Sequence, residues 1–278
     1  MRKLLSANFA RLWKSKLFWI LEAMAFLFGA FMYAVVKSNI QNMGTGWLLS
    51  KANYYFFFII LYVAVLTAVF SSIFLGTEYS DGTLRNKLTV GHCRRDVYIS
   101  NWILIVAVTV SFILTHFLAA VIIGIPAGGI AVVTAVDHMA SKLACSLLIA
   151  LAYASVFTMT SMMDTSKARC AVVNMVLAVA LIVAGFMAYS ALMQPELTFR
   201  MVKQPDGSYI QEHGIPNPRY VSGNSRTILS IAEAFLPSSL ALRVAMGTFS
   251  IPGVIGTSAL TIFLIAVGII LFKKKDIK

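Results

Sequence analysis

The sequence contains six long apolar runs, and these runs constrain the fold more than any other feature. They are Phe18–Val36, Tyr54–Gly76, Val97–Ile123, Lys142–Met162, Cys170–Met193 and Pro252–Phe272. An α-helix rises ~1.5 Å per residue, so about 20 apolar residues cross the hydrocarbon core of a bilayer. Proline is absent from the interior of every run. The pattern predicts an all-α polytopic membrane protein with six transmembrane helices.

Composition supports a lipid environment. Hydrophobic residues make up 59% of the 278 positions and charged residues only 12%. A soluble domain is typically about 45–50% apolar and about a quarter charged, so these few charges could not cover so large an apolar core in water. The net charge of +12 comes from short basic clusters beside the apolar runs. That placement is typical of the cytosolic flanks of a membrane protein, and we expect no nucleic-acid partner.

The basic residues also predict the orientation of the chain. Fifteen of them lie on the side of the N-terminus if there are six spans: Arg2, Lys3, Arg11, Lys14, Lys16, Arg85, Lys87, Arg94, Arg95, Lys167, Arg169, Lys273, Lys274, Lys275 and Lys278. The short loops on the other side hold only Lys37, Lys51 and Lys142. Short cytosolic loops carry the excess of Lys and Arg, so both termini are expected in the cytosol.

Residues 1–17 have the pattern of an amphipathic helix lying on the inner leaflet. Four residues share one arc and would anchor this helix in the interface: Leu5, Phe9, Leu12 and Trp13. The alternative is a simple basic flank that orients the first span. Residues 18–278 would then form the six-span transmembrane domain.

The segment 194–251 is the sizeable extramembrane part and is predicted to be extracellular. Pro205-Asp206-Gly207 is a strong turn signal, and the residues on either side, 198–203 and 208–211, are expected to pair as a β-hairpin. Two short helices should follow, Ser225–Phe235 and Ser238–Met246, separated by Pro237. Each is too short to cross a bilayer, so we expect a re-entrant or interfacial pair.

No catalytic or nucleotide-binding motif is present. The sequence lacks GxxxxGK[ST], HExxH and GxSxG patterns, and its cysteines and histidines form no ligand spacing, so we expect neither an enzyme nor a metal site. Two polar residues lie within predicted spans. Glu22 is expected to reach the cytosolic interface or to meet Lys14 or Lys16. His116 is expected to make an interhelical hydrogen bond rather than to carry protons.

The cytosolic loop 77–96 predicts a short helix over Asp81–Val90. Asp81 suits an N-cap, and Gly91 suits the position just after the helix. An isolated helix of this length is marginal in water, so it needs a surface to pack against.

The faces of this short helix indicate a contact surface. Leu84 and Leu88 share one face, while Arg85 and Lys87 project elsewhere as a basic rim. This arrangement fits insertion of the leucines into a groove on a cytosolic protein. The other interpretation is a plain connector between two spans.

At these residues the sequence resembles the ABC-2-type permeases, the membrane subunits of bacterial ABC exporters. The resemblance lies in Glu78 followed by Gly82-Thr83-Leu84-Arg85, and then in the basic step Arg94-Arg95 into the third span. A second similar stretch is Asn217–Gly223 leading into Ala234-Phe235-Leu236-Pro237, as in lantibiotic or bacitracin-type exporters of Firmicutes. The step Gly91-His92-Cys93 departs mildly from the small-residue pattern usual there.

The resemblance implies a permease subunit of an ATP-driven exporter in the bacterial plasma membrane. Two permease subunits, identical or related, would form the path, and two separate ATPase chains would hold ATP and Mg²⁺. This chain would carry no cofactor, and its cargo would be a hydrophobic or amphipathic molecule such as an antimicrobial peptide. The implied ATPase-coupling residues are Glu78, Asp81, Gly82, Thr83, Leu84, Arg85, Lys87 and Leu88.

Two other functions stay open at this point. An ATP-independent carrier or channel would need substrate or ion ligands in mid-membrane, and the scarcity of charge within the spans disfavours it. A membrane sensor that binds peptides or lipids through the segment 194–251 is compatible with the sequence.

Overall fold

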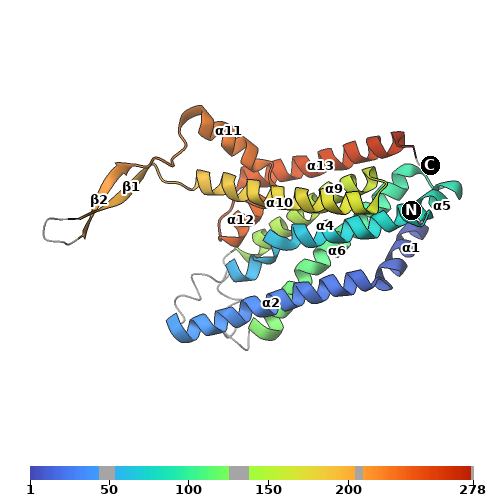
Figure 1. Ribbon diagram of the computed structural model, residues 1–278, viewed down its shortest axis with the longest axis horizontal. Helices are drawn as coiled ribbons and strands as arrows, with labels where there is room; N and C mark the ends of the chain where they lie inside the picture. The colour runs from blue at the N-terminus through green and yellow to red at the C-terminus, as the bar shows by residue number, and fades with distance from the viewer. Residues whose placement is uncertain (44–53, 125–137, 204–208, 277–278) are drawn as a thin grey trace.

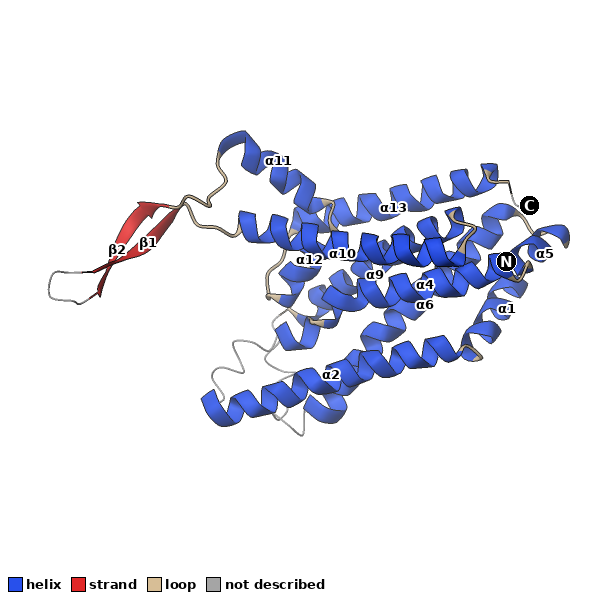
Figure 2. Ribbon diagram, viewed as in Figure 1, coloured by secondary structure: helices blue, strands red, loops and turns tan. Residues whose placement is uncertain are grey.

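The computed structural model describes residues 1–43, 54–124, 138–203 and 209–276 and shows an elongated helical bundle (Figure 1). A two-stranded hairpin projects from one end, and every strand in the described ranges belongs to it (Figure 2). The short helix α5 (Thr83–Thr89) and both termini lie at the opposite end. The helices of the bundle are α1 (Arg2–Trp13), α2 (Lys16–Met43), α4 (Ile59–Ser80), α6 (Arg94–Ala119), α9 (Met139–Met163), α10 (Lys167–Leu192) and α13 (Ile251–Lys274).

Within the described residues, six helical segments are long and apolar enough to cross a bilayer, as the sequence predicts. They are Lys16–Val35, Tyr54–Ser80, Arg94–Ile123, Met139–Met163, Lys167–Leu192 and Ile251–Lys274. A π-helical turn, Ala120–Gly124, extends α6. In two of these spans an end differs from prediction because polar residues at that end find partners in the protein. The second span continues past Gly76 to Ser80, and the third begins at Arg94.

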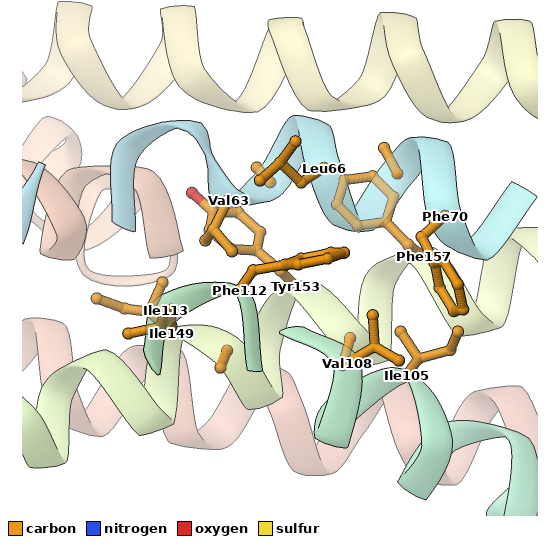
Figure 3. Close-up of a cluster of buried hydrophobic side chains, with 14 of the residues drawn as sticks. Val63, Leu66, Phe70, Ile105, Val108, Phe112, Ile113, Ile149, Tyr153 and Phe157 are labelled. Atoms are coloured by element: carbon orange, nitrogen blue, oxygen red, sulfur yellow. The ribbon is translucent and has the colours of Figure 1, made fainter. Parts of the chain in front are cut away.

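The core of the bundle lies between α4, α6 and α9. Phe70 of α4, Phe112 of α6 and Phe157 of α9 are all fully buried and interdigitate with smaller aliphatic side chains (Figure 3). Of the most apolar stretch of each span, 67% is buried in α4 but only 22% in α10 and in α13. The second span is therefore central, and the fifth and sixth are peripheral.

The peripheral helices present apolar side chains outward. Val176 and Phe186 of α10 and Ile262 and Phe263 of α13 are more than half exposed. A face of this kind requires lipid or another membrane protein as its neighbour, because in water it would be an aggregation site.

The hairpin predicted in the segment 194–251 is present. Strand β1 (Leu197–Lys203) pairs antiparallel with β2 (Tyr209–Pro216), with an irregularity between Thr198 and Phe199. The predicted turn at Pro205-Asp206-Gly207 lies outside the described residues. Strand β1 begins one residue before its predicted limit, and β2 ends five residues beyond its predicted limit.

The predicted helix–break–helix pair follows the hairpin. Helix α11 (Gly223–Ala234) and helix α12 (Pro237–Ala245) meet at an angle of 90°. Helix α12 is buried against α9, α10 and α13, and Ser238 at its start packs on Gly185 of α10 so closely that a Cβ there would lie 2.2 Å from its Oγ. Helix α11 instead exposes Ile228 and Ile231. The pair thus links a surface helix to a buried one.

Candidate functional site

The candidate site lies at the end of the bundle that holds α5 and both termini (Figure 1). Helix α4 ends at Ser80 with Asp81 as its C-cap, and Gly82 then adopts a φ of 66° before Thr83 begins α5. The prediction of Asp81 as the N-cap is therefore wrong. The chain reverses direction at a residue in the left-handed backbone conformation. Glycine adopts this conformation without a steric penalty, so the N-cap of α5 is Gly82.

The other end of α5 agrees with the prediction at Gly91. Gly91 has a φ of 94°, its N–H donates to the Leu88 carbonyl at 3.0 Å, and the N–H of His92 donates to the Lys87 carbonyl at 3.2 Å. These two bonds form a Schellman motif, which satisfies carbonyls that the helix end would leave unpaired. The short helix is thus firmly terminated at its C-terminal end.

Glu78, near the end of α4, is the centre of the site. Its side chain is only 1% exposed, and its Oε1 lies 2.8 Å from Nη1 of Arg11 and 2.6 Å from Nζ of Lys87. Its Oε2 accepts a hydrogen bond from Nδ2 of Asn101 at 3.0 Å. A buried carboxylate is tolerable when it is paired and hydrogen-bonded in this way.

Asn8 closes the network. Its Nδ2 donates to Oδ1 of Asn101 at 2.8 Å, and its Oδ1 accepts from Nζ of Lys87 at 2.9 Å. We call the set Asn8, Arg11, Glu78, Lys87 and Asn101 the polar junction. It ties together α1, α4, α5 and α6, so none of these elements can shift at this end without breaking a buried polar contact.

Arg11 belongs to the polar junction and also binds α4 directly. It donates to the Phe74 carbonyl at 3.0 Å and lies 3.7 Å from the centre of the Phe74 ring. Burial lowers the pKa of the Arg11 guanidinium, and the Glu78 carboxylate opposes that shift by stabilising the charged form. Helix α1 is therefore held by charge as well as by apolar contact.

The prediction that the two leucines of α5 insert into a groove on another protein is wrong, because both pack against this chain. Leu84 is only 1% exposed and belongs to the core of this chain, and Leu88 packs against that core. They face this chain's own bundle and are not free to enter a groove on another protein. Lys87 also turns inward to Glu78 and is not part of an exposed rim. The exposed face consists of Arg85, Asn86, Thr89 and Val90, with Val90 80% exposed.

Helix α1 also differs from the predicted arc. Its buried residues are Leu4, Asn8 and Leu12, spaced at i, i+4 and i+8, and it packs on α6. Of the predicted anchors Leu5, Phe9, Leu12 and Trp13, Leu12 is buried in the protein, Leu5 and Phe9 are half-buried, and Trp13 is 59% exposed. The buried face of α1 is thus shifted by about one residue from the predicted arc, because Asn8 turns inward to form hydrogen bonds in the polar junction.

Hydrogen bonds that the sequence analysis did not predict hold the C-terminal residues beside the polar junction. Arg94 donates to the backbone carbonyls of Phe272, Lys273 and Lys275. Nζ of Lys275 donates to the Tyr79 hydroxyl at 2.8 Å and to the Met162 carbonyl at 2.9 Å. Burial lowers the pKa of Lys275 to about 8.

Of the predictions for the two polar residues within spans, the one for His116 is confirmed, and Glu22 does not pair with either predicted lysine. His116 is buried, and its Nδ1 lies 3.2 Å from the Tyr62 hydroxyl of α4, so the predicted interhelical hydrogen bond is confirmed. Glu22 meets neither Lys14 nor Lys16. It accepts hydrogen bonds from Ser111 and Thr115 of α6, each at 2.5 Å.

The described part of the chain brings no three His, Cys, Asp or Glu side chains together as metal ligands would be. What the geometry of the site does show is a connection of four helices, α1, α4, α5 and α6, through the polar junction.

Residues 4–185 match the family described as ABC-2 family transporter protein, and this stretch is well over half of the chain. No curated protein and no solved structure matches. The matched residues include α1, the polar junction, α5 and the spans up to most of α10. The chain therefore belongs to the ABC-2 family of membrane transporter proteins.

Proposed function

We propose that this protein is the permease subunit of an ATP-driven exporter and that α5 is the helix through which a separate ATPase moves it. Family membership supports a transporter component, and such permeases normally work with an ABC ATPase. In this proposal ATP and Mg²⁺ bind to the ATPase chains, and this chain catalyses nothing. The basic segments favour a cytosolic position for α5 and both termini in a bacterial plasma membrane.

The observation that carries the proposal is the contrast between the two faces of α5. The inner face is locked by Leu84 in the core and by the ion pair of Lys87 with Glu78. The outer face offers Arg85, Asn86 and the 80%-exposed Val90. A force applied to the outer face would reach α1, α4 and α6 through the polar junction, since packed side chains and hydrogen-bond networks carry coupling between distant sites.

A second permease subunit, identical or related, completes the proposal. The outward apolar faces of α10 and α13 offer large surfaces for such a partner or for lipid. The translocation path would form between the two subunits, and the cargo would be a hydrophobic or amphipathic molecule such as an antimicrobial peptide. The pair α11 and α12 would lie near its exit.

Co-purification of the tagged permease with an ABC ATPase from its own host cell tests the role of α5. Val90→Asp places a charge at the exposed end of α5 and should abolish co-purification while the permease still folds. Met201→Asp on the exposed hairpin is the matched control and should leave the complex intact. A complex that survives Val90→Asp and Arg85→Glu together would overturn the assignment of α5.

ATP hydrolysis by the reconstituted complex tests the cargo. We expect stimulation by amphipathic antimicrobial peptides. Stimulation by lipids or drugs but by no peptide would exclude the peptide cargo and leave the exporter. Transport by the permease without any ATPase would instead support an ATP-independent carrier, and peptide binding with neither hydrolysis nor transport would support a sensor.

A further inference from the structure

A second buried carboxylate, Glu22, lies in a groove that the polar junction does not include. The groove has a volume of about 440 Å³ and is lined by Trp13, Phe18, Trp19, Glu22, Ala23, Phe26, Ser111 and Thr115. We call it the Glu22 groove. It lies where α1 turns into α2, and Glu22 is six residues from the start of α2, or ~9 Å along the helix. Five of the groove's eight lining residues therefore belong to the first three turns of α2, within the first span.

The carboxylate of Glu22 has no cationic partner among the described residues. Oε1 accepts from the Ser111 hydroxyl and Oε2 from the Thr115 hydroxyl, each at 2.5 Å. The side chain is 8% exposed, so little water reaches it. An ionisable group inside a span is costly unless a partner compensates it, and hydroxyl groups bring no opposite charge. Each oxygen has also used only part of its capacity to accept hydrogen bonds.

Aromatic rings line the same groove as this carboxylate. The rings of Trp13, Phe18 and Trp19 form one cluster, with centroids 5.2 to 5.9 Å apart. The indole N–H of Trp19 donates to the Trp13 carbonyl at 3.1 Å, which fixes the Trp19 ring. Both tryptophans are more than half exposed. The face of an aromatic ring attracts a cation, and tryptophan does so most strongly.

We propose that the Glu22 groove binds the ammonium group of an amphipathic cation that enters from the bilayer. The carboxylate excludes an anionic head, and the aromatic rings supply the apolar and cation-binding walls that an alkylammonium head requires. The apolar tail would lie along the exposed side chains of Ile20, Met24 and Leu27 on α2. Only the identification of this ligand as a cargo rests on the proposed exporter function; the binding itself does not.

The test is a binding titration of the purified permease in dodecyl maltoside micelles with dodecyltrimethylammonium. Trp13 and Trp19 line the groove, so intrinsic tryptophan fluorescence reports occupancy. We expect saturable binding that dodecanol does not compete away. Glu22→Gln keeps one acceptor oxygen for the hydroxyls but removes the charge, and should weaken binding by about tenfold or more. Glu196→Gln, on the exposed segment before the hairpin, should bind as the unchanged protein does.

A second variant keeps the proposal testable if Glu22→Gln does not fold. Trp19→Leu alters an exposed ring and should weaken binding by roughly threefold, in line with the strength of a cation–aromatic contact. Equal binding by Glu22→Gln, or equal binding of dodecanol and the ammonium probe, would overturn the proposal. A permease that binds the probe but never co-purifies with the ATPase would overturn the exporter function and leave this site standing.

Discussion

Glu78 and Glu22 are both buried glutamates on helices that contact α6, and their surroundings differ in one respect. Glu78 meets the cations Arg11 and Lys87 and an amide. Among the described residues, the hydrogen-bond partners of the Glu22 carboxylate are the hydroxyls of Ser111 and Thr115. A third buried glutamate, Glu233, follows the first pattern, with Arg243 at 2.7 Å.

The difference indicates two uses of the same residue type. A carboxylate closed by cations from this chain holds helices together, because its charge is already compensated. A carboxylate left without a cation and open to an aromatic groove is available for a cation from outside the chain. The variants below break or sharpen that distinction, in order of decreasing effect.

The largest effect is expected from Glu78→Gln. This variant leaves Arg11 and Lys87 partly buried without a counter-charge, and loss of one partner of a buried pair typically costs about 3–5 kcal/mol. The free energy of unfolding, measured by denaturant titration in mixed detergent micelles, should fall by that amount. Arg85→Gln on the exposed face is the control and should change it by about 0.5 kcal/mol or less. An unchanged stability would contradict the structural role of the polar junction.

Asn101→Leu should have an intermediate effect. It removes the hydrogen bonds to Oε2 of Glu78 and from Nδ2 of Asn8, and leaving buried polar groups unsatisfied costs about 1–3 kcal/mol. The same titration measures it. The double variant Asn8→Ala with Asn101→Leu should cost less than the sum of the single variants, because the two side chains share one network. Strict additivity would mean that they act independently.

Glu22→Gln should change the free energy of unfolding little, in contrast to Glu78→Gln. Its amide oxygen still accepts one of the two hydroxyl hydrogen bonds, and the uncompensated charge is gone. We expect a change within about 1 kcal/mol in either direction. A loss as large as that of Glu78→Gln would show that Glu22 holds helices together as Glu78 does.

The last effect appears only when the pH is changed, and it concerns Lys275, a cation at the same end whose hydrogen-bond partners are a hydroxyl and a carbonyl rather than a carboxylate. Burial lowers its pKa from the ordinary 10.5 to about 8, so the unfolded chain binds the proton more tightly. Stability should therefore rise as the pH increases from about 8 towards 10.5, and be lost again as the pH falls to about 8. Lys275→Met should flatten that part of the thermal-unfolding profile. An identical profile would contradict the shift.

The spans could be predicted from the sequence because their signal is local. Twenty or more apolar residues in a row, free of internal proline, need no knowledge of neighbours, and the turn residue Gly91 follows from helix termination alone. The hairpin and the break at Pro237 were predictable for the same reason. Their strand and helix ends differ from prediction by at most five residues, and the largest difference is at the end of β2, which pairs with β1 as far as Pro216.

The candidate site could be predicted only in part because its contacts are not local. The sequence marks Leu84 and Leu88 as one apolar face, but periodicity does not say whether that face meets the same chain or a partner. Asn8 interrupts the buried stripe of Leu4 and Leu12, and Asn101 interrupts an apolar run. Those two interruptions are the signal that could have indicated a polar network, yet its members lie up to 93 residues apart.

Site-directed cross-linking tests the central claim most directly, namely that the outer face of α5 contacts a separate ATPase. The variant Val90→Cys would be made in a Cys93→Ser background, because Cys93 is exposed nearby. A short bifunctional thiol-to-amine reagent should join position 90 to the ATPase, while Ile228→Cys on α11 at the opposite end should give no such product. Cross-linking from position 228 but not from position 90 would contradict the account.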